Sequence, residues 1–210
     1  ENFNFERPDW TLFRSVSTLP QKAGVPAIRL RRLVLKELAD NALDAGGQVE
    51  VGELDGGGYF VQDDGPGIAP DEIATLFSIN RPMISSKLLR LPTSGALGNG
   101  LRVVAGAVLA SRGRLEVLTR GQRIKVVPMD DGTTKTVITS TDYPNGTRIE
   151  IQFGPALPAD ASALDWADLA ARVGKSGEFY KGRTSPFWYD PDSFFELFQA
   201  AGNRVVRDLI

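Results

Sequence analysis

Four short segments in the second half of the chain predict an antiparallel sheet, and this pattern constrains the fold more than any other feature. In each segment apolar and polar residues alternate, as they do in a strand that buries one face. Asn145-Gly146, a dipeptide typical of turns, precedes the last segment. The four segments are Leu115 to Thr119, Arg123 to Pro128, Lys135 to Ser140 and Thr147 to Phe153.

Other strands and several helices are expected around these segments. A helix is predicted from about Ala27 to Ala45, where Gly46-Gly47 ends the pattern, and a second from Gly100 to Ser111. Between them, two strands joined by a glycine-rich hairpin turn and a short helix that proline opens are predicted. These three elements are Val49 to Leu54, Tyr59 to Gln62 and Pro70 to Ser78. The stretch from Asn80 to Asn99 has no clean period and is predicted as a long loop.

The end of the chain differs from the rest. After Gly154-Pro155 the pattern becomes helical, from Leu164 to Val173 and from Ser193 to Leu209, with many aromatic residues. We therefore expect an N-terminal arm (residues 1–20), a main domain (residues 21–155) and a helical C-terminal extension (residues 156–210), a candidate start of a second domain. Because the chain begins at Glu1 rather than at methionine, a segment of a longer protein is one interpretation.

The chain of 210 residues contains neither cysteine nor histidine. This excludes disulfides, metal sites built on thiolate or imidazole, and catalytic cysteine or histidine within the chain. Acid–base chemistry is left to carboxylates, lysine or tyrosine. The formal net charge of −2 supplies no overall field that would attract a polyanion. No apolar run approaches the roughly 20 residues that span a bilayer, so we expect a cytoplasmic protein with no membrane partner.

Glu37, Asn41 and Asp44 lie on one side of the first predicted helix. At 100° per residue they fall within about 60° of one another, beside an apolar arc of leucine and alanine. A carboxylate at the edge of a buried face is costly unless it is paired, and an amide oxygen suits Mg²⁺. Taken alone, such a pattern is more often an ordinary solvated stripe.

The sequence Asp63-Asp64-Gly65-Pro66-Gly67-Ile68 directly follows a predicted strand. Taken alone it is a turn. In a binding site, an aspartate at a strand end accepts a hydrogen bond from an exocyclic amine of a ligand, and the glycines let that ligand approach the backbone.

A third segment, Gly95-Ala96-Leu97-Gly98-Asn99-Gly100, leads into the second long predicted helix. Backbone N–H groups at a helix start suit phosphate oxygens, because of both the helix dipole and the geometry. The segment is not a Walker A loop, since no Gly-Lys-Ser/Thr follows, and Val103 breaks a GxGxxG pattern. By itself it is a weak signal.

In this order and spacing the three segments resemble the motifs of the GHKL ATPases, the superfamily of gyrase-type topoisomerases, Hsp90, histidine kinases and MutL. The resemblance covers about Arg29 to Phe153 and includes Gly146-Thr147 at the start of a late strand. It implies the Bergerat fold, an α/β (α+β) two-layer sandwich whose mixed, mostly antiparallel sheet carries helices on one face, here with a short helical C-terminal segment. It also implies an ATPase that binds ATP with Mg²⁺ as cofactor between the helices and a lid.

The resemblance also implies roles for individual residues. Glu37 resembles the base that polarises the attacking water, Asn41 resembles the Mg²⁺ ligand, and Asp63 resembles the aspartate that reads adenine. The other nucleotide-binding positions that it implies are Gly67, Ile68 and Thr147 near the adenine, the lid residues Lys87, Gly95, Gly98, Gly100 and Leu101, and the acidic Asp44.

Within the superfamily, the sequence most resembles the B subunit of topoisomerase VI. Ser85-Ser86-Lys87, Leu97-Gly98-Asn99-Gly100-Leu101 and the tail from Ser185 to Leu209 carry this likeness. It implies a nucleotide-driven dimerisation switch and a DNA-associated or effector subunit outside this chain. Three alternatives stay open: a histidine-kinase-type catalytic domain, an ATP-binding switch with little turnover as in MutL or Hsp90, and an α/β domain that binds no nucleotide.

The arm from Glu1 to Pro20 carries more large apolar side chains than an isolated segment keeps in water. They are Phe3, Phe5, Trp10, Leu12 and Phe13. One interpretation is that they pack on the chain's own domain. The other, which the resemblance implies, is that the arm crosses to a second protomer when ATP orders the lid, so that a homodimer forms on ATP binding.

Overall fold

The computed structural model describes residues 8–81, 99–143, 145–176, 186 and 191–206. The chain divides into two compact units, the first made of residues 1–81 and 100–176 and the second of residues 82–99 and 177–210. Most of the predicted loop from Asn80 to Asn99 lies outside the described residues. The sheet and the helices that cover it belong to the first unit.

A six-stranded sheet is the frame of this unit, and each of its strand pairs is antiparallel. The strand order is β1-β2-β6-β3-β4-β5, so that β6 lies between β2 and β3. The strands are β1 (Val49–Glu53), β2 (Tyr59–Asp63), β3 (Arg114–Thr119), β4 (Gln122–Pro128), β5 (Thr134–Ser140) and β6 (Thr147–Gln152). All six predicted strands are confirmed, with each end within one residue of its expected position.

The alternation of side chains along the strands decides which face is buried. Val61, Ile149, Val117 and Ile124 are opposite one another on four neighbouring strands, and all four belong to the hydrophobic core. Residues one position away along each strand point to the other face. The polar and apolar positions of the predicted strands are therefore separated onto two faces.

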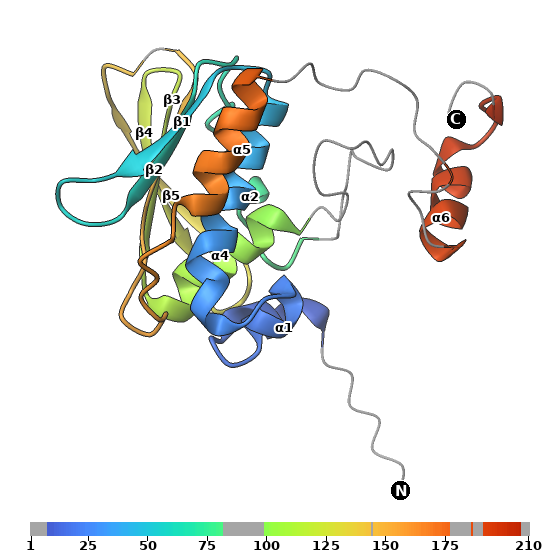
Figure 1. The fold of residues 1–210 in the computed structure, drawn as a ribbon, viewed down its shortest axis with the longest axis horizontal. Coiled ribbons are helices and arrows are strands. Elements are labelled where there is room, and N and C mark those ends of the chain that lie inside the picture. Colours follow the sequence, from blue (N-terminus) through green and yellow to red (C-terminus); the bar gives the residue numbers. More distant parts are fainter. Residues whose placement is uncertain (1–7, 82–98, 144, 177–185, 187–190, 207–210) are drawn as a thin grey trace, which may run out of the picture. The chain divides into compact units, whose positions relative to one another are not determined.

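Three helices cover the buried face of the sheet (Figure 1). They are α2 (Leu30–Asp44), α4 (Gly100–Ser111) and α5 (Asp165–Ser176). α2 lies between the other two and also contacts β1 and β2. The expected two-layer arrangement, with helices on one face of the sheet, is confirmed.

Short elements complete the first unit. They are η1 (Asp9–Arg14), α1 (Leu19–Ala23), η2 (Ala27–Arg29) and α3 (Ile73–Leu76). The helix predicted from Ala27 is thus split, because its first residues form a separate 3-10 turn after Pro26. The helix predicted from Pro70 to Ser78 is shorter than expected, since the chain first makes a turn in which Glu72 N donates to Ala69 O.

The described part of the N-terminal arm packs on the chain's own first unit. Phe13, in η1, is fully buried, and Trp10 packs partly buried against the same core. The guanidinium of Arg102, in α4, lies 4.6 Å from the centre of the Phe13 ring. Phe3 and Phe5 lie outside the described residues.

The second unit contains α6 (Pro191–Ala201). Within it the rings of Phe194 and Phe198 meet edge to face, with centroids 4.8 Å apart. The prediction that this helix continues to Leu209 is wrong, because Gly202 follows α6 with a φ of +57°, outside the helical region. Over the part of the chain that the structure describes, no helix is both long and apolar enough to cross a membrane.

Candidate functional site

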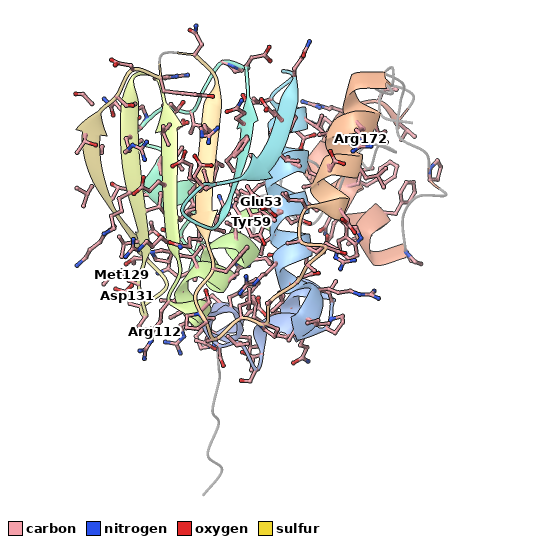
Figure 2. The ribbon with its side chains drawn as sticks, turned by 60° about the vertical axis from the view of Figure 1, so that its left-hand side comes forward. Glu53, Tyr59, Arg112, Met129, Asp131 and Arg172 are labelled. Atoms are coloured by element: carbon pink, nitrogen blue, oxygen red, sulfur yellow. The ribbon has the colours of Figure 1, made fainter. Side chains whose placement is uncertain are left out.

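Three polar side chains form a buried row at one end of the sheet. Asp63 ends β2, Thr147 begins β6 and Thr119 ends β3, and the strand register pairs Asp63 with Thr147 and Thr147 with Thr119. Asp63 lies two residues after the core residue Val61, so that the row faces the helices. Their exposed fractions are 7%, 5% and 0% in this order. Glu53 and Tyr59, which Figure 2 shows together, lie at the opposite end of β1 and β2.

Asp63 is a buried carboxylate at the end of β2. Its Oδ1 accepts a hydrogen bond of 2.9 Å from the backbone N–H of Gly65. Burial raises the pKa of Asp63 above its ordinary value, while the backbone hydrogen bonds from Gly65 and Thr147 act in the opposite direction. A buried carboxylate of this kind gains from a further donor, such as an amino group of a ligand.

The loop after β2 lies directly on this row. A Cβ on Gly67, whose φ is +74°, would be 2.8 Å from Oγ1 of Thr119 and 3.1 Å from the carbonyl oxygen of Gly146. The next residue, Ile68, donates its backbone N–H to Oγ1 of Thr119 over 3.0 Å. The glycine is therefore required both for its backbone conformation and for the close approach.

The turn before β6 also packs against Asp63 and Thr119. Gly146 has a φ of +71°, and a Cβ there would overlap the carbonyl oxygen of Asp63. Thr119 donates its hydroxyl to the carbonyl oxygen of Gly146 over 3.0 Å. Two loops that are about 80 residues apart in sequence thus meet around the buried threonine.

Glu37 and Asn41 lie on α2 and meet the start of α4. The side-chain amide of Asn41 donates from Nδ2 to the backbone oxygen of Glu37 over 2.6 Å, so Oδ1 is the atom of Asn41 that suits a cation. A Cβ on Gly100 would overlap Oε2 of Glu37. The Glu37 carboxylate therefore lies against Gly100, the first residue of α4.

The other end of α2 contacts the loop after β2. A Cβ on Gly65 would be 3.3 Å from Cβ of Ala45, which follows α2, and Asp64 Oδ1 accepts a hydrogen bond of 2.6 Å from Gln48 N. From Glu37 to Ala45 the chain rises about 12 Å along the helix. One helix thus joins the carboxylate at the start of α4 to the buried row at the end of the sheet.

The structure brings most of the predicted residues into two groups. Glu37, Asn41 and Gly100 form one, and the other contains Asp63, Gly67, Ile68 and Thr147. Asp44 is exposed at the last residue of α2, and the side chain of Leu101 packs against the hydrophobic core. The predicted residues Lys87, Gly95 and Gly98 lie outside the described residues.

Sequence reasoning missed Thr119 and Arg120. The alternation of Leu115 and Val117 places Thr119 on the core face at the end of the same strand, and this signal could have identified it. Arg120 donates from Nε to Pro66 O and from Nη2 to Gly67 O, both over 3.4 Å. No local pattern indicates that contact, because the partners are more than 50 residues away.

The residues present fit a magnesium-bound nucleotide better than a metal held by protein alone. Across residues 8–81 and the other described ranges, no cluster of three or more His, Cys, Asp or Glu side chains could hold a metal ion. Mg²⁺ commonly takes one or two protein oxygens and completes its shell with water and the phosphates of a substrate. Asn41 Oδ1, one helical turn from Glu37, is suited to such a shared site.

Residues 27–156, more than half of the chain, match a family model described as "Histidine kinase-, DNA gyrase B-, and HSP90-like ATPase". The chain is 34% identical over 131 residues to the DNA mismatch repair protein MutL of Thermus aquaticus, a match that covers 56% of this chain and 22% of that protein. A solved structure described as the crystal structure of the N-terminal domain of a DNA repair protein matches with a TM-score of 0.39 and 22% identity. That match covers 68% of this chain and 41% of the solved one.

Proposed function

Because the chain belongs to the histidine kinase-, DNA gyrase B- and HSP90-like ATPase family, we propose that it binds and hydrolyses ATP in the presence of Mg²⁺, and that the site lies between the buried row and the start of α4. The buried carboxylate of Asp63, beside Thr147 at the end of the sheet, is the observation that carries the proposal.

The adenine is assigned to the Asp63 end. A carboxylate that is 7% exposed accepts the hydrogen bond of an exocyclic amino group without competition from bulk water. Guanine presents a carbonyl oxygen at the equivalent position, so that two acceptors would face each other. The site should therefore select ATP over GTP.

The phosphates are assigned to the other end of α2. The rise of about 12 Å from Glu37 to Ala45 is comparable with the length of an extended nucleotide. The positive end of the helix dipole at the start of α4 favours phosphate oxygens.

Glu37 is proposed to orient and polarise the attacking water, since the chain contains no histidine or cysteine to act as a base. Asn41 would hold Mg²⁺ through Oδ1, one helical turn from Glu37. Bound Mg²⁺ supplies charge neutralisation for the phosphoryl group. The chain's own contribution is to keep the carboxylate and the amide one helical turn apart on α2, with the carboxylate against Gly100.

We also propose that the chain acts as part of a larger assembly. The similarity to a DNA mismatch repair protein supports a DNA-associated role, although the match spans 22% of the length of that relative. We include a nucleotide-dependent homodimer and an effector subunit outside this chain. A specific relationship to topoisomerase VI stays a prediction.

Titration of ATP and GTP against the purified chain with Mg²⁺, followed by steady-state hydrolysis, tests the proposal. ATP should bind at least tenfold more tightly than GTP, Glu37→Ala should bind ATP but lose hydrolysis, and Asn41→Ala should lose the Mg²⁺-dependent part of binding. Equal affinities for the two nucleotides contradict the adenine assignment, and a parental hydrolysis rate in Glu37→Ala contradicts the role of the base.

Light scattering with a non-hydrolysable ATP analogue tests the switch. The chain should be monomeric without nucleotide and dimeric with it, and removal of residues 1–7, which precede the buried Phe13, should abolish the dimer while ATP still binds. A monomer at saturating analogue, both for this chain and for a longer form of the protein, would rule the switch out.

A further inference from the structure

We propose that Thr119 is a positioning residue that holds the adenine pocket in its ATP-selective shape, with Arg120 as a second contact to the same loop. The inference rests on the proposed function, because it concerns the same pocket. It adds a residue that makes no predicted contact with the nucleotide and acts through Asp63, Gly67 and Gly146.

Thr119 is the point where the two loops around Asp63 are joined. Its Oγ1 accepts from the backbone N–H of Ile68 and donates to the carbonyl oxygen of Gly146, each over 3.0 Å. Its side chain is fully buried, so that water does not compete for either hydrogen bond. A single hydroxyl thereby links the loop after β2 to the turn before β6.

Both loops also touch Asp63 directly. The carbonyl oxygen of Asp63 lies where a Cβ on Gly146 would be, and Oδ1 of Asp63 accepts from the N–H of Gly65. A shift of either loop therefore moves the groups that surround the carboxylate. The two loops are held together by one buried hydroxyl, and Gly67 lies so close to it that a Cβ on this residue would be 2.8 Å away.

Arg120 holds the same loop from its exposed side. Its guanidinium donates to the carbonyl oxygens of Pro66 and Gly67, at 3.4 Å each. The residue has a φ of +47°, a conformation that is uncommon for a residue with a side chain. Thr119 thus contacts the loop after β2 from its buried side, and Arg120 contacts it from its exposed side.

Replacement of Thr119 by valine keeps the shape of the side chain and removes both hydrogen bonds. The Ile68 N–H and the Gly146 carbonyl group are then left without this partner in a buried place, and the loops must move to find others. We expect ATP affinity to fall about tenfold and the preference for ATP over GTP to shrink by a similar factor. The hydrolysis rate at saturating ATP should change about twofold or less, because Glu37 lies at the other end of α2.

The test is a titration of ATP and GTP with the parent chain, Thr119→Val and Thr119→Ser, together with KM and kcat for ATP. Serine keeps the hydroxyl and should retain the parental ratio of affinities. Thr134→Val is the matched control: Thr134 is also a buried strand threonine whose hydroxyl donates one hydrogen bond, to Phe77 O over 3.0 Å, and it begins β5 at the far end of the sheet. It should lose stability and keep the ATP to GTP ratio.

The outcomes separate the two proposals. If the parent prefers ATP and Thr119→Val has the same ratio of affinities, the role of Thr119 is overturned while the proposed function stands. If the parent binds no nucleotide, the proposed function fails and the role of Thr119 fails with it. Should Thr119→Val not fold, Arg120→Ala at the exposed contact gives the answer: a reduced ATP to GTP ratio supports the inference, and a parental ratio overturns it.

Discussion

Polar side chains on the two faces of the sheet have different kinds of hydrogen-bonding partner. On the helix-facing side, Asp63 and Thr119 form hydrogen bonds with backbone groups of nearby loops. On the opposite face, polar and charged side chains form hydrogen bonds and ion pairs with one another. Gln62 links Glu50 to Arg148, Arg148 pairs with Glu150, and Arg123 bridges Glu150 and Glu116.

This difference separates a candidate site from a stabilising surface. The outer network is largely satisfied by its own members, and its charges remain in contact with water, so it adds modest stability. The inner row is enclosed by backbone, and its only carboxylate is held in a place where water is scarce. Polar residues of similar type thus serve different purposes because the strand places them on different faces.

The largest expected effect is on the inner side, at Gly146. Alanine there would combine a φ of +71° with an overlap between its Cβ and the carbonyl oxygen of Asp63. We expect the free energy of unfolding to fall by about 3 kcal/mol. Urea denaturation measures it, with Gly56→Ala as control, since a Cβ at Gly56 meets nothing within 4 Å. Equal stabilities of the two variants would mean that the turn does not close on Asp63 as described.

The next effect is on ligand binding. Asp63→Asn replaces an acceptor-only carboxylate by an amide, and ATP affinity should fall by about 10- to 100-fold, the range of a hydrogen bond to a charged group. Glu150→Gln, the same change of chemistry on the outer face, should leave the affinity at the parental level. Isothermal titration calorimetry compares the two, and a similar loss in both variants would erase the distinction between the faces.

A smaller effect is the dependence of ATP binding on pH. Burial raises the pKa of Asp63, so this carboxylate takes up a proton at a higher pH than an exposed aspartate does. As the pH falls through that raised pKa, the acceptor is lost and ATP affinity should fall. ATP itself also takes up protons as the pH falls. The affinity should therefore be measured as a function of pH for both the parent chain and Asp63→Asn, and the difference between the two curves reports the protonation of Asp63.

Stability responds to the same group with the opposite sign. In the pH range between the ordinary and the raised pKa of Asp63, the folded chain binds more protons than the unfolded chain, so this group lowers stability as the pH rises. Asp63→Asn should remove that slope. A slope of unfolding free energy that is unchanged in the variant would show that Asp63 does not titrate as a buried group.

The smallest effect is expected on the outer face. Arg148→Met removes the contacts to Gln62 and Glu150 and should lower the free energy of unfolding by about 1 kcal/mol or less, with a smaller loss at high salt. ATP affinity should not change. A larger loss of affinity than of stability would connect the outer network to the site.

Most of the sheet could be predicted from the sequence because alternation and turn chemistry are local properties. The sequence predicts six strands, and the described residues contain the same six; the candidate residues Glu37, Asn41 and Asp63 also follow from local motifs. Helix ends were less predictable. The helix expected to reach Leu209 ends at Ala201, and the short α1 begins at Leu19, with Pro20 in its first turn, where a proline ring fits.

The sequence by itself determined which residues share a face, since a period of 2 in strands and 3.6 in helices follows from backbone geometry alone. It did not determine which loops meet. Only the tertiary structure placed β6 between β2 and β3, and this order brings Thr147 between Asp63 and Thr119 and closes Gly146 on Asp63. Only packing of α2 against α4 set Glu37 beside Gly100, because contacts between distant residues depend on how whole elements pair and not on any local period.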